Sequence, residues 1–550
     1  MTARYLDQQV PVRLEFVANR PDFQFQAPDP VNVIDELVFD QLKRLKINPS
    51  DTCNDGTFVR RVWLDVTGLL PPADQARKFV NSTDPHKRAA LIDQLLSSPE
   101  FIDQQTMRWA DLLRAEEKTL DATGLAAYHK WIHERMAADT PLNEFVAELI
   151  SARGSTYHVP ATNFYRALRQ PDERAEATAQ VFLGIRLQCA KCHNHPFDRW
   201  SQDDYYGWAN YFGRIDYKII ENKRRDSNDK HEFSGEQIVE LKSEGDVTNV
   251  RTGKPADLRF LGDKSSGSPP TVPAAEAETE PAETDRLTTL ASWFRNDNQR
   301  FAVTQTNRIW YQLMGRGIVD PVDDFRATNP PVNPALLQAL TAEFLRGQQR
   351  TRPIMRLILN SRTYQLSSVS NPTNADDEHC FSHVTPQRLT AEQTLDALTR
   401  VLETSATFGG HSDGTRAVQL VGVRNGEFRY SRPESGDRFL KLFGRPNRLQ
   451  SCECERTNET TLAQTFELIS GELTTELLAK PDNRIVRAVS SDQSTDEFLS
   501  DLYWSALARA PTDDEKSSLT NYINRATERR TALQDVTWAV LNSNEFLLRH

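Results

Sequence analysis

Apolar residues recur at helical spacing along most of the chain. Residues 29–45 place five apolar side chains on one face of a helix: Ile34, Leu37, Val38, Leu42 and Leu45. Ser98 and Thr140 each stand as a capping residue before a proline that suits the first turn of a helix. A further helix is expected over residues 174–187. The pattern therefore predicts a mainly α-helical protein.

Two parts of the chain follow the alternating pattern of strands instead. Residues 10–17 alternate apolar and polar side chains, which predicts a strand near the start of the chain. Between residues 213 and 262, polar turns separate three short segments with strand-forming residues: 217–220, 238–241 and 247–250. We expect these segments to form a small β insert in an otherwise helical, multi-domain protein.

Residues 264–285 are rich in Ser, Pro, Ala and Glu and have no apolar periodicity from which a core could form. This composition predicts a flexible linker and a domain boundary. The expected organisation has five parts: an N-terminal strand segment (1–28), a helical domain (29–212), the small β insert (213–263), the linker (264–285) and a helical C-terminal domain (286–550).

Three segments of the chain resemble one another: 61–71, 308–317 and 502–511. Each is followed by a helix with a similar end: 96–101, 359–364 and 541–546. This similarity predicts three copies of one helical unit, in which an aromatic side chain near the end packs into a shared core. The alternative is that unrelated amphipathic helices share the pattern by convergence. Stacked copies would also suit a non-enzymatic scaffold or binding module.

Composition narrows the class of protein. A length of 550 residues with 38% hydrophobic residues fits several domains with substantial cores. The longest apolar runs fall well short of the roughly 18 residues that a membrane span needs, so none is expected. The net charge is −11 with both signs interspersed, which argues against a nucleic-acid partner, because such binding needs a concentrated basic surface. The opening residues lack the apolar core of a signal peptide.

The segment from Cys189 to His193 is Cys-Ala-Lys-Cys-His, the attachment signature of c-type haem. Two thiols at this spacing can reach the two vinyl groups of one porphyrin, and the adjacent imidazole can bind the iron. The composition would produce the pattern by chance in roughly one such chain in a thousand. We therefore expect haem c to be held by Cys189, Cys192 and His193. The alternatives are a redox dithiol, a disulfide or half of a zinc site.

Cys452 and Cys454 form a second cluster. In an extended segment, side chains at positions i and i+2 project to the same side, so both thiols could bind one ion. With Cys189 and Cys192 they would supply four soft ligands for zinc or iron and would join the two halves of the protein. We expect the two clusters to lie close together. The alternatives are unrelated surface thiols and a local disulfide between Cys452 and Cys454.

His195 stands two positions after His193 and is too close in sequence to reach the other face of the same haem. We expect His195 either to support His193 through hydrogen bonding or to bind another metal ion. In the non-haem alternative, His193 and His195 hold a second, catalytic ion that could activate water.

Three carboxylates follow one another closely at Asp320, Asp323 and Asp324. They could serve acid/base chemistry or bind a hard cation, but such a loop is more often a solvated cap or a partner of arginine. The sequence has no Gly-rich phosphate loop, nucleophile elbow or zinc-protease helix motif. Hydrolase and nucleotide chemistry therefore have no support, and the sequence leaves open whether the protein is an enzyme.

At these motifs the chain resembles a known family. Residues 176–206 resemble the cytochrome-like domain of large secreted planctomycete proteins. The half after the linker resembles the planctomycete-specific domain of unknown function that accompanies it. The segments that carry this second resemblance are 307–310, 315–325, 361–368, 443–446 and 452–456.

The resemblance implies an exported, extracytoplasmic redox protein with one haem c. Such a protein would pass electrons to a redox partner protein or oxidise an unknown substrate. The chain departs from the family in starting without a leader or a preceding cytochrome domain. A cytoplasmic version would favour the zinc or iron site, because haem is attached to cysteine outside the cytoplasm.

Overall fold

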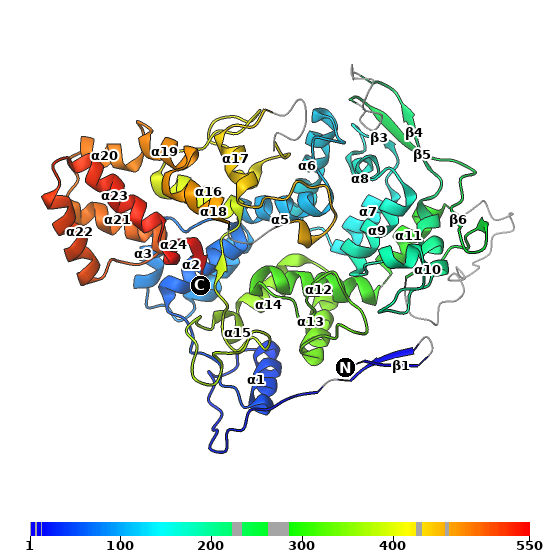
Figure 1. The fold of residues 1–550 in the computed structure, drawn as a ribbon, viewed down its shortest axis with the longest axis horizontal. Coiled ribbons are helices and arrows are strands. Elements are labelled where there is room, and N and C mark those ends of the chain that lie inside the picture. The colour runs from blue at the N-terminus through cyan, green and yellow to red at the C-terminus, as the bar shows by residue number, and fades with distance from the viewer. Residues whose placement is uncertain are drawn as a thin grey trace. The chain divides into compact units, whose positions relative to one another are not determined.

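The computed structural model describes residues 2–5, 8–12, 14–222, 234–261, 285–296, 298–424, 432–456 and 461–550. Helices account for most of these residues and the strands are short, which confirms the predicted mainly α-helical fold (Figure 1). The predicted linker, 264–285, lies outside the described residues except for Asp285. The chain divides into two compact units, and each is assembled from three separate segments.

The first unit comprises residues Met1–Asn19, Trp109–Met355 and Arg448–Glu453. Its helices are α6 (Ala122–Ala137), α7 (Leu142–Ser151), α8 (Asn163–Ala167), α9 (Pro171–Leu183), α10 (Gln202–Ala209), α11 (Arg286–Arg295), α12 (Gln299–Met314) and α13 (Pro334–Arg346). Helix α11 packs along α7, and α12 packs against both α9 and α13. Aromatic side chains fill this core, where Phe182 at the end of α9 meets Phe294 of α11 edge-on with ring centroids 6.0 Å apart.

The predicted β insert lies in this unit. Strands β4 (Ile215–Ile219) and β5 (Gln237–Leu241) pair antiparallel, with Tyr217 opposite Val239, and β3 (Gly154–Ser155) adds to the other edge of β5. Strands β6 (Thr248–Asn249) and β7 (Lys254–Pro255) form a separate short ladder. The strands expected at 217–220, 238–241 and 247–250 are therefore confirmed with small shifts at their ends.

The prediction of a strand over residues 10–17 is wrong in length, because the strand ends earlier. Strands β1 (Thr2–Tyr5) and β2 (Gln8–Pro11) form an antiparallel hairpin that ends at Pro11. In the described residues that follow, the backbone is irregular and the apolar side chains of Leu14 and Phe16 are exposed. An alternating pattern becomes a strand only where a neighbour pairs with it, and β2 already has its partner in β1.

The second unit comprises residues Arg20–Arg108, Arg356–Asn447 and Cys454–His550. Its helices before residue 450 are α1 (Val33–Leu45), α2 (Asp55–Thr67), α3 (Ala73–Asn81), α4 (Lys87–Leu96), α15 (Arg362–Gln365), α16 (Ala391–Leu402) and α17 (Ser435–Leu442). Those after it are α18 (Leu462–Ser470), α19 (Glu472–Ala479), α20 (Arg484–Ser490), α21 (Thr495–Leu507), α22 (Asp513–Arg525), α23 (Arg529–Leu541) and α24 (Asn544–Leu547). Helix α16 lies in the middle of the apolar core, in contact with α17, α19, α20 and α21.

The three similar segments of the sequence adopt the same succession of elements. Helices α2, α12 and α21 carry Trp63, Trp310 and Trp504. Each helix ends at a residue with left-handed backbone: Gly68, Gly315 and Ala508. Later in each copy, a serine hydroxyl donates to the carbonyl three residues before it, at 2.7 Å in all three cases: Ser98, Ser361 and Ser543. The same serine oxygen accepts the backbone N–H of a buried aromatic residue: Phe101, Tyr364 and Phe546. The helices around these serines are α5 (Pro99–Leu112) and α14 (Thr351–Leu359), besides α15, α23 and α24. Three identical sets of contacts support repetition over convergence.

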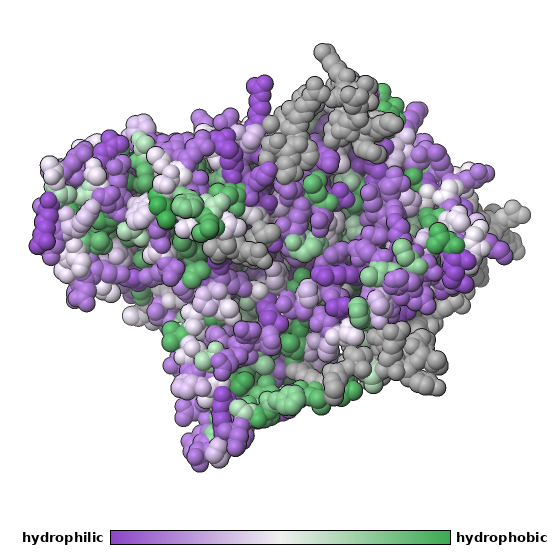
Figure 2. All heavy atoms as spheres, viewed as in Figure 1, coloured by the Kyte–Doolittle hydropathy of each residue, from purple (hydrophilic) through white to green (hydrophobic). Residues whose placement is uncertain are grey.

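Polar side chains cover most of the face drawn in Figure 2, and an apolar patch lies over α18. Leu462, Phe466 and Ile469 are exposed there at helical spacing. Among the described helices, none combines the length and the apolar character that a membrane span requires.

Candidate functional site

The helix expected over residues 174–187 stops four residues early. Helix α9 begins at Pro171, where Gln170 and Glu173 form a capping box, and it ends at Leu183. Gly184 follows with φ of 63°, a left-handed conformation that terminates helices and that residues with a Cβ rarely adopt. A Cβ at Gly184 would also lie 2.6 Å from Cδ2 of Phe325. The cysteine motif is therefore not a continuation of the helix but lies on a separate turn.

Cys189 lies on that turn, the 3₁₀ helix η2 (Gln188–Lys191), and Cys192 follows as its C-cap, whose N–H donates a hydrogen bond to the Cys189 carbonyl. Residues i and i+3 eclipse one another in a 3₁₀ helix, so the two cysteine side chains lie on the same side of the turn. Both thiols are free and exposed, while Ala190 between them is buried. The methyl group of Ala190 thus lies on the buried side of the turn, and both cysteine sulfur atoms lie on its exposed side.

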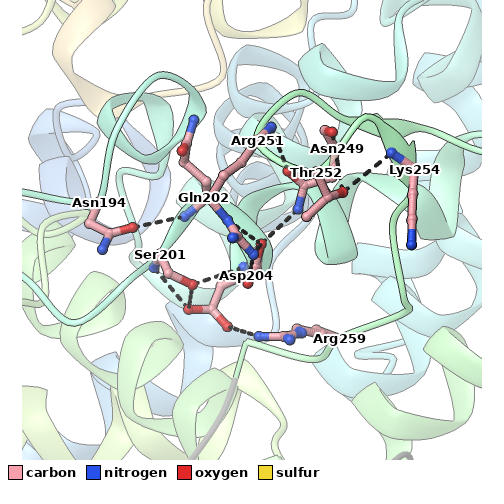
Figure 3. A network of polar contacts seen from close by, with 10 residues as sticks. Asn194, Ser201, Gln202, Asp204, Asn249, Arg251, Thr252, Lys254 and Arg259 are labelled. Carbon is pink, nitrogen blue, oxygen red and sulfur yellow. Dashed lines mark hydrogen bonds and ion pairs between the residues drawn. The ribbon is translucent and has the colours of Figure 1, made fainter.

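His193 continues the exposed side of the turn. Its Nδ1 lies 2.8 Å from the backbone carbonyl oxygen of Asn194, and only a protonated nitrogen can donate to that oxygen. In the neutral ring the proton is therefore on Nδ1, and Nε2 keeps its lone pair. The Asn194 side chain in turn accepts from the backbone N–H of Gln202 at 3.4 Å (Figure 3).

Lys191 fixes the backbone of the turn from two directions. Its Nζ lies 2.6 Å from Oδ2 of Asp172, near the start of α9, and this hydrogen bond raises the pKa of Lys191. Its carbonyl oxygen accepts hydrogen bonds from Tyr206 Oη at 3.0 Å and from Gln202 Nε2 at 3.3 Å, both on α10. The turn is held between two helices, although its cysteines are exposed.

Helix α10 is itself anchored where it begins. Ser201 and Asp204 form a capping box, with the Ser201 hydroxyl 2.7 Å from Oδ2 of Asp204 (Figure 3). Arg251 binds both carboxylate oxygens of the neighbouring Asp203, and Arg259 lies 3.5 Å from Asp204. These contacts tie the start of α10 to the β6–β7 region and so stabilise the helix that holds Lys191.

His195 is buried, and its polar atoms form hydrogen bonds within its own loop. Its backbone N–H donates to the Trp200 carbonyl at 2.7 Å, and its Nδ1 accepts the Phe197 N–H at 3.2 Å. The ring also hydrogen-bonds to the backbone of Arg186, and burial lowers the pKa of His195. Through its backbone N–H and its ring, His195 organises the loop after the motif.

The acidic loop lies against the segment that leads to the cysteines. Asp323 is 2% exposed, and its carboxylate accepts from Gln180 Nε2 and Arg186 Nη2, each at 2.6 Å. The backbone N–H of Phe325 donates to the Gly184 carbonyl at 2.9 Å. Asp324 pairs with Arg326 at 3.1 Å. The sequence predicted that this loop would be either a solvated cap or a partner of arginine. The structure confirms that it pairs with arginine.

Cys452 and Cys454 are both disulfide-bonded, and because the other four of the six cysteines are free, they are bonded to each other. The local disulfide is therefore the alternative that the structure shows. The site of four thiolates formed with Cys189 and Cys192 is absent from the described part of the chain, because two of its sulfur atoms are consumed in a bond. Within the described ranges, no group of three or more His, Cys, Asp or Glu side chains could hold a metal ion.

The residues of the cysteine turn fit attachment of a haem better than binding of a bare ion. A metal ion needs its ligands to converge within about 2.3 Å of one point. A porphyrin needs two thiols at its edge and one imidazole nitrogen at its centre, which are separate places. Cys189, Cys192 and His193 supply two free thiols and an imidazole whose Nδ1 lies against the Asn194 carbonyl, all on one exposed turn. A groove of about 800 Å³ between α6, α7 and the η1 turn (Pro160–Thr162) lies elsewhere, and no motif residue lines it.

Comparison with known families covers both halves of the chain. Residues 33–217 match the family model PSCyt2, described as a protein of unknown function (DUF1549). Residues 285–523 match the model PSD1, described as a protein of unknown function (DUF1553). The chain carries these two domains in tandem.

The tandem is consistent with the predicted pair of family domains, and neither description gives an activity. The cysteine turn belongs to the DUF1549 segment, whereas the acidic loop at 320–326 belongs to the DUF1553 segment. The first compact unit thus contains residues of both. No curated protein and no solved structure matches the chain.

Proposed function

We propose that the protein is an extracytoplasmic redox protein carrying one haem c. Cys189 and Cys192 would hold the haem through thioether bonds, and His193 Nε2 would bind its iron. The observation that carries the proposal is the exposed turn with two free thiols on one side and a histidine whose Nδ1 proton is held by the Asn194 carbonyl. When bound, the haem would supply one-electron chemistry.

The surrounding residues have defined tasks in this proposal. The Asn194 carbonyl orients the His193 ring by accepting a hydrogen bond from its Nδ1–H. Asp172 and Tyr206 hold Lys191, and so keep the two sulfur atoms at a fixed spacing. Because the turn is exposed, a redox partner protein can approach it closely. Electron transfer to such a partner and oxidation of a substrate are both compatible with this arrangement.

The location follows from the attachment chemistry. Haem is joined to cysteine by machinery outside the cytoplasm, so a protein that carries haem c works in the periplasm or is secreted. Two exposed free thiols at this spacing are also the substrate that such machinery takes.

The test is production of the full chain together with haem-attachment machinery, followed by visible spectroscopy and haem staining on a denaturing gel. We expect a Soret band and haem that stays with the chain after denaturation. Replacement of both Cys189 and Cys192 by serine should abolish both signals. Cys380→Ser, which removes a free thiol of the second unit, is the matched control and should keep them. A chain without a Soret band, with all four free thiols still titratable, would overturn the proposal.

A redox dithiol is the second candidate, favoured by the free state and shared side of the two thiols. Without haem, Cys189 and Cys192 would cycle between dithiol and disulfide. Peptide mapping of haem-free protein after mild oxidation distinguishes the two functions, since only a dithiol site links these two cysteines reversibly. Metal analysis of the same sample tests the zinc or iron alternative.

A further inference from the structure

A path of aromatic rings runs through the first compact unit. It contains four of the nine tryptophans of the protein: Trp208, Trp293, Trp109 and Trp131. Trp208 meets Trp293 directly, with ring centroids 5.9 Å apart. Phenylalanines fill the two remaining intervals, Phe294 and Phe182 before Trp109, and Phe145 after it. Successive centroids there are 5.0 to 6.4 Å apart, the spacing of closely packed aromatic pairs.

One end of the path lies at the cysteine turn. Tyr206 Oη donates at 3.0 Å to the carbonyl of Lys191, which stands between the two cysteines in sequence. Burial raises the pKa of Tyr206, and the Cys192 thiol is close enough to act in the same direction. The ring of Tyr206 meets that of Tyr205 edge-on, with centroids 5.1 Å apart. Tyr205 and Trp208 are three positions apart on α10, a spacing that makes side chains neighbours and so connects the turn to the tryptophans.

The other end of the path lies at the groove of about 800 Å³ beside α6 and α7. Trp131 lines this groove, and its indole N–H donates to Oε1 of Glu148 at 2.9 Å. Ala127, Val159 and Pro160 add apolar surface to the lining. A groove of this size with both apolar and polar lining suits a small aromatic molecule that carries a hydroxyl group.

The side chains of the path suit the transfer of single electrons. Indole and phenol rings lose one electron far more readily than a phenylalanine ring, so the tryptophans and tyrosines are the places where a charge can rest. A ring that has lost an electron is a cation, and a carboxylate within hydrogen-bond distance favours that form. Glu148 stands in this position at Trp131, and Glu176 stands 2.7 Å from the hydroxyl of Tyr205. Each end of the path thus has an oxidisable ring bonded to a carboxylate.

We propose that the groove is the place where a phenolic donor is oxidised, and that the aromatic path carries its electrons to the cysteine turn. This inference rests on the haem proposed at that turn, and the terminal oxidant is a peroxide. Each donor molecule gives one electron to the path and releases its phenolic proton to the solvent in the groove. Two electrons and two protons reduce one hydrogen peroxide at the haem, so that its O–O bond breaks and two waters form. Donor and peroxide are thus kept at separate places.

The path can be tested in the full chain without haem. Cys189→Ser and Cys380→Ser leave Cys192 as the accessible free thiol, because Cys53 is buried. A ruthenium tris(bipyridine) label on Cys192 is excited by light in the absence of oxygen, and a cobalt(III) pentaammine acceptor removes one electron from it. The oxidised label then takes an electron from the aromatic rings, and a nitroso spin trap bonds to the radicals that result.

Trypsin locates the trapped radicals. It releases residues 131–135, in which Trp131 is the single tryptophan, and residues 200–214, which include the aromatic side chains of α10. We expect the trap on both peptides. Its absence from residues 131–135 would overturn the proposal, because the charge would not have reached the groove.

Two variants interrupt the path and keep an aromatic side chain in place. Trp109→Phe and Trp293→Phe should each lose most of the trap on residues 131–135 and keep that on residues 200–214. Trp538→Phe, at a half-buried tryptophan of the second unit, is the matched control and should keep both. Unchanged trapping at Trp131 in a folded path variant would contradict transfer through these rings.

Guaiacol, a small phenol, tests the groove. It should lower trapping on residues 131–135 more than on residues 200–214, because it returns an electron to Trp131. An equal decrease on both peptides would remove the groove as the site of the donor. None of these measurements needs haem, whereas the Soret band tests the haem itself, so failure of the path and failure of haem attachment are told apart.

Discussion

Oδ1 of Asp323 lies 2.6 Å from Nη2 of Arg186, which joins the acidic loop to the segment leading to Cys189. Asp323 is 2% exposed and accepts a second hydrogen bond from Gln180. The position of the cysteine turn therefore depends on a carboxylate more than 130 residues away in sequence.

Asp323→Ala is expected to lower the free energy of unfolding by about 2 kcal/mol, because Gln180 and Arg186 lose their common acceptor. The loss is moderated because water can reach the Arg186 side chain, which is 36% exposed. Urea denaturation followed by circular dichroism measures the change. Asp40→Ala is the control, since the Asp40–Arg44 pair is largely exposed and should change stability by less than about 0.5 kcal/mol. Equal losses in both variants would contradict a structural role for Asp323.

Gly184→Ala should destabilise the protein by about 2–4 kcal/mol, because a left-handed alanine is strained and its Cβ would clash with Phe325. Gly253 offers a matched comparison, since its φ is 68° and nothing lies within 4 Å of an added Cβ. Gly253→Ala should cost only about 1 kcal/mol. Thermal or urea unfolding of the two variants would show whether the close approach of Phe325 matters beyond the backbone strain.

Glu392 on α16 should give the second unit sensitivity to acid. Burial disfavours its charge, but Arg456 and Arg445 outweigh burial and lower the pKa of Glu392 below 4.5. Because the folded pKa is lowered, its contribution is present above pH 4.5 and is lost as the pH falls through the folded value.

Arg456→Ala should lower stability at neutral pH by about 3 kcal/mol, since it leaves a buried carboxylate short of a partner. It should also move the onset of acid unfolding to higher pH. The control is Arg438→Ala, whose pair with Glu472 is mostly exposed and should contribute less than about 1 kcal/mol. Unfolding curves between pH 3 and 7 test this prediction. If acid unfolding of Arg456→Ala begins at the same pH as in the unaltered protein, the stabilising role of the Arg456–Glu392 pair is contradicted.

Asp396 lies one turn further along α16. In contrast to Glu392, it should make the protein more stable at acidic pH than at neutral pH. Burial raises the pKa of Asp396 from 3.8 to about 6, although the N–H groups of Ala417 and Val418 partly stabilise its charge. The folded state then holds a proton that the unfolded state has lost. Stability should therefore fall by about 3 kcal/mol as the pH rises from 4 to above 6. Asp396→Asn should flatten this part of the stability profile, and a profile equal to that of the unaltered protein would contradict the shifted pKa.

Local features of the sequence predicted local features of the structure well. Serine followed by proline located the start of α5, and β-branched runs located β4 and β5. The spacing of Cys189, Cys192 and His193 placed these residues within a single turn of chain, but it did not predict that the turn is separate from the helix and exposed.

Features that depend on distant contacts could not be predicted in the same way. The end of α9 at Gly184 is enforced by Phe325, and the site at Asp323 is completed by Arg186, neither of which is near in sequence. Six cysteines permit many pairings, so the bond between Cys452 and Cys454 could be only one alternative among several. A signal for the acidic loop did exist, since isolated aspartates in a loop often pair with arginine.

The composition of the first compact unit has a consequence for shortened forms of the protein. It joins residues 109–217 of the DUF1549 match to residues 285–355 of the DUF1553 match, and its core is built by α7 against α11 and α9 against α12. A gene fragment that encoded either match alone would produce helices whose apolar faces had no covering, and such a polypeptide is prone to aggregation or degradation. Recombination between the two segments would thus separate one half of a core from the other. In this protein, parts of the two matched segments therefore belong to one folding unit.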